Sequence, residues 1–287
     1  MKIQNQSTIS YVFRNFFYLL PLTLLPALLL AFSSSTINYL TPVDLLAKMS
    51  IGGYDIVFFY NDVYCYLTLL NTSPRWWVWL LGIAAAFISL CGTFSAIERH
   101  MRLGVKQFSR ALVYINDCFL PLLSYLILVF IAGELLALIS SGFILLSYTI
   151  GLRAWPLFTA SAVIIALQYL IFSVLIIFTI CTVPARLMER YRLNIAISYS
   201  TQLVGKKFFR IYGAFLLILF ISGSLLAFSK YLLSYSPKEY GEIPHMAVST
   251  LFNIFWLMAA PAFSLRTYSS LTDSERKDLE TKLFLKR

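Results

Sequence analysis

The chain has 287 residues, of which 59% are hydrophobic and 13% are charged, and its mean hydropathy is +0.77. Charged residues make up about a quarter of a typical soluble domain, so this composition excludes a water-soluble fold. The net charge of +10 would suit nucleic acid, but Lys and Arg lie at the ends of apolar stretches, where they meet anionic lipid headgroups. We therefore predict an integral membrane protein that binds membrane lipids and no nucleic acid.

Six apolar stretches are long enough to cross a membrane as helices, because a span takes about 20 residues. They cover 16–38, 76–97, 119–146, 156–183, 209–234 and 246–266. The sequence therefore predicts an all-α, polytopic membrane protein with six transmembrane helices. We expect one integral membrane domain over 1–287 that ends in a cytoplasmic tail at 267–287.

Lys and Arg are concentrated in alternate gaps between these spans. The leader, the second gap, the fourth gap and the tail are rich in basic residues, whereas the other gaps are poor or balanced. Short loops rich in Lys and Arg stay in the cytoplasm. We predict that both termini are cytoplasmic and that the protein lies in a bacterial inner membrane. Ala31, Ser33 and Ser35 also leave open a cleaved signal peptide, which would not change the orientation of the other spans.

An internal repeat is indicated by the ends of the second and fourth spans. Cys91 is followed by Glu98-Arg99, Cys181 is followed by Glu189-Arg190, and the segment 114–130 matches 204–220 at an offset of 90. A period longer than one helix is typical of duplicated units, although Leu-rich helices also resemble each other by chance. We predict a repeat of two-span units.

Three basic stretches have the period of an amphipathic helix: the leader, 101–117 and 193–208. In the leader, Val12, Phe13 and Phe17 share a face opposite Arg14 and Asn15. Such helices lie in the membrane interface, with the basic face toward the headgroups. We predict three of them, each preceding a pair of spans, and call each an elbow.

Several basic residues near the predicted elbows are candidates for binding anionic headgroups. They are Arg99, Arg102, Lys106, Arg110, Arg190, Arg192, Lys206 and Lys207. For Glu98-Arg99 and Glu189-Arg190, an alternative is an interfacial ion pair that ends the helix at the membrane surface.

Four polar residues fall at membrane depth in the predicted spans: Glu134, Gln168, Ser222 and Asn253. A charged carboxylate at that depth costs roughly 2.5–3.5 kcal/mol on the insertion scale, so Glu134 should be paired, protonated or in contact with water. Two interpretations stay open. These groups form a site for a proton or a small polar solute, or they form interhelical hydrogen bonds worth roughly 0.6 kcal/mol each.

No catalytic, nucleotide or metal signature occurs in the sequence. The four cysteines form no CxxC, His100 and His245 fall on opposite sides of the predicted membrane, and no Walker, GxSxG or HExxH motif is present. We therefore predict neither an enzyme nor a site for a cofactor or metal.

The segment AISYSTQLVGKKFFRIYGAFLLILF (196–220), with its earlier echoes, resembles a broad group of six-span bacterial membrane proteins. The group includes uncharacterised integral membrane families of Gram-positive bacteria and the membrane domain fused to some glycerophosphodiester phosphodiesterases. The phosphodiesterase domain itself is absent, so the resemblance implies an architecture and no activity or site.

These patterns favour a non-enzymatic membrane accessory or scaffold protein that binds lipid or a partner membrane protein. The alternative is a transporter or channel for a small polar solute, with Glu134 in its core. An enzyme that acts on lipids has the least support, because the catalytic groups are missing.

Overall fold

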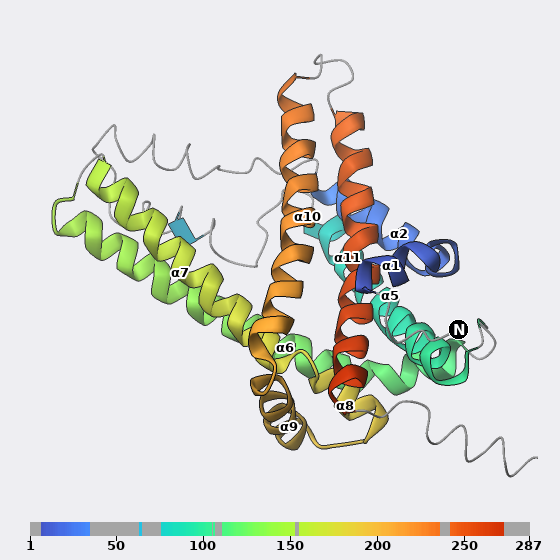
Figure 1. Ribbon diagram of the computed structural model, residues 1–287. Helices are drawn as coiled ribbons and strands as arrows, with labels where there is room; N and C mark the ends of the chain where they lie inside the picture. Colours follow the sequence, from blue (N-terminus) through green and yellow to red (C-terminus); the bar gives the residue numbers. More distant parts are fainter. Residues whose placement is uncertain are drawn as a thin grey trace, which may run out of the picture. The chain divides into compact units, whose positions relative to one another are not determined.

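A computed structural model describes residues 7–34, 63–64, 76–104, 106, 111–152, 155–235 and 242–272 (Figure 1). Within these ranges every regular element is a helix, as the all-α prediction requires. In chain order the helices are α1 (Thr8–Arg14), α2 (Phe16–Ser34), α5 (Trp76–Leu103), α6 (Ala111–Thr149), α7 (Trp155–Thr179), α8 (Thr182–Met188), α9 (Leu193–Gly205), α10 (Phe208–Tyr235) and α11 (Glu242–Thr272).

Among the described residues, five helical stretches are long and apolar enough to cross a membrane, with mean hydropathies between 1.6 and 2.7. They are Phe16–Ser33, Trp77–Met101, Ile115–Thr149, Pro156–Met188 and Ile243–Thr272. By length and composition, these stretches indicate a multi-pass membrane protein. The predicted span 209–234 coincides with α10, whose described apolar stretch, Phe208–Ile221, is shorter than a span. The predicted fifth span, and with it the total of six, therefore stays a prediction.

The third and fourth predicted spans have different ends in the structure. Helix α6 has 39 residues and is about 58 Å long, so it exceeds a hydrocarbon core of about 30 Å and must tilt or extend beyond it. Helix α7 ends at Thr179, and a turn at Ile180 and Cys181 separates it from α8. Pro184 contributes to the break because it has no N–H to donate to the carbonyl of Ile180, although Pro121 in α6 and Pro261 in α11 lie inside helices that continue.

Two of the three predicted elbows coincide with separate short helices. Helix α1 precedes α2 and helix α9 precedes α10. The prediction of an elbow helix at 101–117 is wrong, because α5 continues through Leu103 and α6 begins at Ala111. Gly104, with a φ of 69°, supplies the left-handed conformation that commonly ends a helix.

The chain divides into two compact units, which are Met1–Ser35, Trp77–Tyr125 and Ile177–Arg287 (unit 1) and Thr36–Trp76 and Leu126–Ile176 (unit 2). This division does not test the prediction of one integral membrane domain over 1–287.

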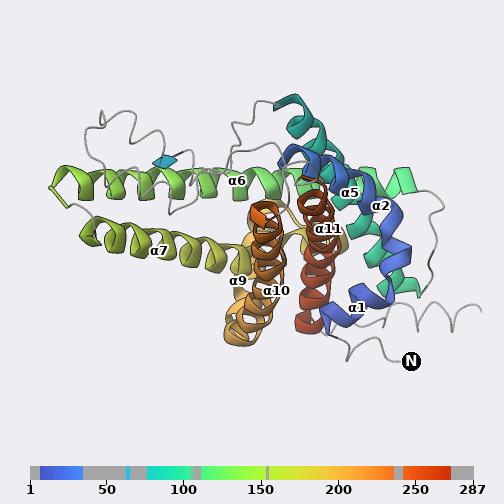
Figure 2. The ribbon, with the colours of Figure 1, turned by 90° about the horizontal axis from the view of Figure 1, so that it is seen from above.

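In unit 1, α11 is the central helix. It contacts α2, α10, α1, α8 and α9, and Figures 1 and 2 both show it beside α10. Met258, Ala259, Ala262 and Leu265 are buried along it. Small side chains such as the two alanines let neighbouring helices approach closely.

In unit 2, parts of α6 and α7 run alongside each other as a hairpin (Figure 2). Its buried core consists of Val63, Ala137, Ile144 and Leu157. The connection after α6 contains Gly151, whose φ of 93° is accessible to glycine at little cost. Unit 2 thus has a narrow core, which helps to position the polar side chains described below.

Candidate functional site

Helix α9 is held in place at the break between α7 and α8. The Ser200 hydroxyl donates to the carbonyl oxygen of Phe178 (2.7 Å) and accepts from the backbone N–H of Cys181 (3.1 Å). The Ser264 hydroxyl of α11 donates to the carbonyl oxygen of Ile180 (2.7 Å), the group that Pro184 leaves without its usual helical donor. Two serines from distant segments therefore satisfy the interrupted backbone and attach α9 to it.

A tight turn connects α8 to α9. Arg190 adopts a φ of 55°, a left-handed conformation that is uncommon for a residue with a side chain. Beside it, the buried Tyr268 hydroxyl donates to Glu189 Oε1 at 3.4 Å. The Tyr199 ring lies 5.5 Å from the ring of Tyr191 and 6.5 Å from that of Tyr268, measured between centroids. These aromatic contacts join the turn, α9 and α11.

The same cluster changes the acidity of Tyr199. Burial raises the pKa of its phenol, and the neighbouring Tyr191 and the negative charge of Glu189 raise it further. Tyr199 therefore stays a neutral hydrogen-bonding group at physiological pH.

Exposed basic side chains lie at both ends of α9. Arg190 and Arg192 precede the helix, and Lys206 and Lys207 follow it. Arg210, in the first turn of α10, is also exposed and was missed from the sequence, although its spacing after the Lys pair could have indicated it. A helix of 13 residues is about 20 Å long, so the two basic groups are about that far apart along it.

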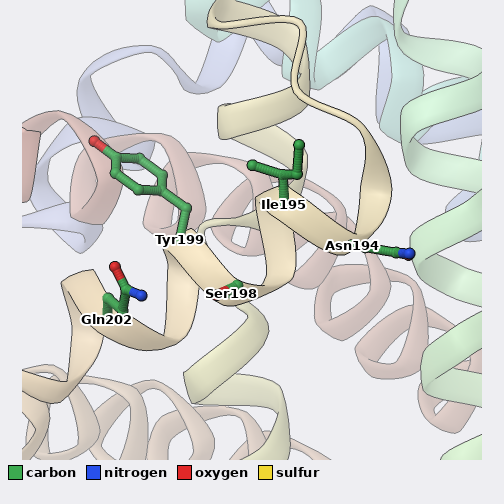
Figure 3. A pocket seen from close by; sticks show the side chains of 5 residues that line it. All are labelled: Asn194, Ile195, Ser198, Tyr199 and Gln202. Carbon is green, nitrogen blue, oxygen red and sulfur yellow. The ribbon is translucent and has the colours of Figure 1, made fainter.

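An open groove of about 370 Å³ lies against α9 between these basic groups (Figure 3). Its lining residues are Asn194, Ile195, Ser198, Tyr199 and Gln202. Two amides and two hydroxyls can donate to or accept from a polar group in the groove. We call α9, this groove and the five flanking basic residues the α9 site.

The other four predicted headgroup residues are not shown to join the α9 site. Arg99 is half-buried on α5, and the exposed Lys106 has its Nζ 5.8 Å from the ring centroid of Tyr18. That distance is typical of a cation–π contact. The side chain of Arg102, and Arg110 altogether, lie outside the described residues.

The four predicted intramembrane residues belong to different units. In unit 2, Glu134 Oε2 accepts a hydrogen bond from the Tyr64 hydroxyl at 2.7 Å, and the buried Gln168 carbonyl oxygen has no hydrogen-bond partner among the described atoms. In unit 1, Asn253 Nδ2 donates to the carbonyl oxygen of Ala27 at 3.3 Å. This hydrogen bond joins α11 to α2, and both interpretations of Asn253 stay predictions. The side chain of Ser222 lies outside the described part.

Tyr64 could not be identified as a partner from the sequence. It precedes the predicted second span by 12 residues, in the first gap between the predicted spans. Nothing in the local pattern links it to a carboxylate 70 positions away. The partner of Glu134 is therefore a product of the fold.

A second buried contact joins α1 to α5. The Tyr11 hydroxyl and His100 Nδ1 are 2.7 Å apart, and the Arg266 guanidinium lies 5.7 Å from the Tyr11 ring centroid. Burial raises the pKa of Tyr11 and the neighbouring Tyr18 adds to this, against the opposing effect of the Arg266 charge. This contact was also missed, because Tyr11 is not on the apolar face predicted for the leader. Asn15, predicted on the polar face, is buried and donates to the carbonyl oxygen of Tyr11.

Within the described residues, no group of three or more His, Cys, Asp or Glu side chains is placed to hold a metal ion. No protein-family model, curated protein or solved structure matches this chain.

Proposed function

We propose that this chain is a six-span membrane protein with both termini in the cytoplasm, and that the α9 site binds anionic lipid headgroups. The proposal keeps the predicted role of a non-enzymatic accessory or scaffold in a bacterial inner membrane. It also keeps the resemblance to six-span bacterial membrane proteins, as an architecture only. One observation carries the binding function: five exposed cations flank one short helix next to an open groove whose lining includes two amides and two hydroxyls.

The chemistry of the α9 site suits a phosphodiester headgroup. Each Lys or Arg near an anionic membrane surface contributes about 1 kcal/mol of attraction. The beginning of α9 adds to this, because Arg192 is its N-cap residue and provides no side-chain cap. The first N–H groups of the helix and its dipole therefore favour an anion there. The amides of Asn194 and Gln202 can donate hydrogen bonds to phosphodiester oxygens, and the flanking cations favour an anionic over a zwitterionic headgroup.

Native mass spectrometry tests this function on the full chain extracted with lipid. Replacing Lys206 and Lys207 with Gln should lower the affinity for phosphatidylglycerol by about 10- to 30-fold, because two attractions of about 1 kcal/mol are lost. The matched control, Lys206→Arg with Lys207→Arg, preserves the charge and should bind as the parent does. Equal phosphatidylglycerol retention by the Gln variant and the parent would refute the proposal, and stoichiometric retention of a protein instead of lipid would favour a partner-binding scaffold.

A second candidate function is passage of a proton or small polar solute through unit 2. It is favoured by the Tyr64–Glu134 hydrogen bond and by the buried Gln168 carbonyl oxygen, which has no partner among the described atoms. Glu134 lies 15 residues before the end of α6 and Gln168 lies 13 residues after the start of α7. In an antiparallel hairpin these spacings correspond to about 22 and 20 Å, so the two side chains lie at similar depth.

Flux through liposomes tests the second candidate. If unit 2 conducts a proton or an ammonium-like solute, Glu134→Gln should abolish the flux, and Tyr64→Phe should reduce it by removing the hydroxyl donor. Tyr169→Phe is the control, since Tyr169 is an exposed side chain on α7. Unchanged flux in Glu134→Gln would remove this candidate and leave lipid binding at α9 unaffected.

A further inference from the structure

Two parts of unit 1 share a sequence of local features. Each consists of a short helix, a break of one or two residues and a long helix that begins with two phenylalanines: Phe16-Phe17 in α2 and Phe208-Phe209 in α10. The ring centroids within each pair are 5.6 Å apart, with interplanar angles of 84° and 75°. The α1–α2 and α9–α10 junctions therefore present their aromatic rings in a similar way.

Side-chain exposure follows the same order in the two junctions. A buried aliphatic residue in the short helix is followed by a highly exposed phenylalanine and then by another buried aliphatic residue. The corresponding pairs, each 192 positions apart, are Val12 and Val204 (2% and 0% exposed), Phe17 and Phe209 (85% and 87%), and Leu19 and Ile211 (0% and 7%). Such agreement continues at Leu25 and Leu217, which are both exposed one to two turns further along the long helix.

An independent contact places the two junctions at one level. Tyr11 of α1 lies against Arg266, and Tyr199 of α9 lies against Tyr268, both near the C-terminal end of α11. Residues two apart in a helix differ by about 3 Å along its axis. Both junctions therefore meet the same end of the same helix, which would lie at one face of the membrane.

We propose that the α1–α2 junction is a second anionic-lipid site, equivalent to the α9–α10 junction and in the same leaflet. This inference rests on the proposed function. The exposed Arg14 corresponds to Lys206 and would bind the phosphate of a phospholipid headgroup, while Phe13 and Phe17 insert among the acyl chains. A basic side chain beside exposed phenylalanines is typical of helices that lie in the membrane interface.

The two sites differ in strength. Lys207 is exposed, whereas the corresponding Asn15 is buried and folded back on the α1 backbone. Among the described residues, the α1–α2 junction itself supplies one exposed cation, Arg14, and the exposed Lys106 lies near it at the Tyr18 ring, whereas the α9–α10 junction supplies Lys206, Lys207 and Arg210. We expect the α1–α2 site to hold its lipid less tightly, because each interfacial cation contributes separately.

Nitroxide labels can measure the membrane depth of both junctions. The label is attached at Phe17→Cys or Phe209→Cys in full-length protein in phosphatidylglycerol-containing vesicles, with Cys65 replaced by Ser. The native Cys91, Cys118 and Cys181 are buried and should not react. Accessibility to molecular oxygen and to a water-soluble nickel chelate then reports depth. The matched deeper controls, Leu25→Cys and Leu217→Cys, should lie about 12 Å further along each helix.

The inference predicts that labels at 17 and 209 reach oxygen, are shielded from the nickel chelate and have the same depth. A label in water at 17 with one in the bilayer at 209 would overturn the inference and leave the function of the α9 site intact. Labels in water at both positions would overturn both. A label at 17 that neither reagent reaches would show that protein covers the junction, which also overturns it.

Headgroup binding has its own test. Arg14→Gln should lower phosphatidylglycerol affinity at the weaker site by about fivefold, the value of one interfacial cation, while Arg14→Lys should not. If Arg14→Gln leaves all bound phosphatidylglycerol in place and Lys206→Gln with Lys207→Gln removes it, only the α9 site binds lipid and the second site is refuted.

Discussion

The two units bury their apolar helices to different extents. Half of the apolar window of α11 in unit 1 is buried, whereas only 17% of that of α6, most of which belongs to unit 2, is buried. In unit 1, polar groups such as Ser200 and Ser264 bridge between helices. Buried oxygen atoms with no partner among the described atoms occur in both units, at Ser89 and Thr182 in unit 1 and at Ser161 and Gln168 in unit 2. The units therefore differ in the burial of their apolar helices: unit 1 has the properties of a packed scaffold, and unit 2 those of a thin hairpin.

The largest expected change in the free energy of unfolding comes from removing a buried side chain of α11. Met258→Ala should lower the free energy of unfolding by about 2–5 kcal/mol, because Met258 is completely buried and its neighbours cannot fill the cavity. Unfolding by sodium dodecyl sulfate in mixed micelles, followed by circular dichroism, measures the change. Leu251→Ala, at an exposed position of the same helix, is the control and should have a much smaller effect. Equal losses would show that α11 is no more tightly packed than a lipid-facing helix.

A smaller loss is expected at the break between α7 and α8. Ser200→Ala leaves the carbonyl of Phe178 and the N–H of Cys181 without their common partner, which should cost about 1–3 kcal/mol. The same unfolding measurement applies, with Ser198→Ala as control because Ser198 is exposed on the same helix. An unchanged free energy of unfolding would mean that Ser200 does not hold α9 in place.

The smallest expected changes in the free energy of unfolding have opposite signs in the two units. Gln168→Leu in unit 2 should leave the free energy of unfolding unchanged or raise it by about 1 kcal/mol, because it removes a buried oxygen atom that has no partner. Asn253→Leu in unit 1 should lower it by roughly 0.6 kcal/mol, the usual value of an interhelical hydrogen bond in a membrane. A loss of more than 1 kcal/mol in Gln168→Leu would show that Gln168 has a hydrogen-bond partner.

Much of the architecture could be predicted because its causes are local. Runs of apolar residues such as 119–146 predict membrane helices whatever their neighbours are, and the structure contains five such helices. The short helices α1 and α9 could also be anticipated, since their periodicity lies within a few turns. The predicted elbow at 101–117 is wrong because its first residues belong to the end of α5 and its last residues to the start of α6. Periodicity alone does not locate the ends of helices.

The candidate sites were less predictable, since they depend on pairs of distant residues. Lys206 and Lys207 could be named as basic residues near a span, but their relation to the groove beside Asn194 and Gln202 follows from how α9 is folded and held. Glu134 could be singled out from its depth alone, whereas its partner Tyr64 could not. The pattern within one segment indicates which side chains need a hydrogen-bond partner, but it does not indicate which residue supplies that partner.

The sequence by itself therefore determined that this is an all-helical membrane protein, because hydropathy acts on each segment separately. The break after α7 lies beside Pro184, but the sequence alone did not locate it, since Pro121 and Pro261 lie inside helices that continue. Only the tertiary structure decided how that break is satisfied, by Ser264 from α11 and Ser200 from α9. It also decided which partners Glu134 and Asn253 have, because hydrogen bonds over 70 or more positions form only when distant segments are brought together.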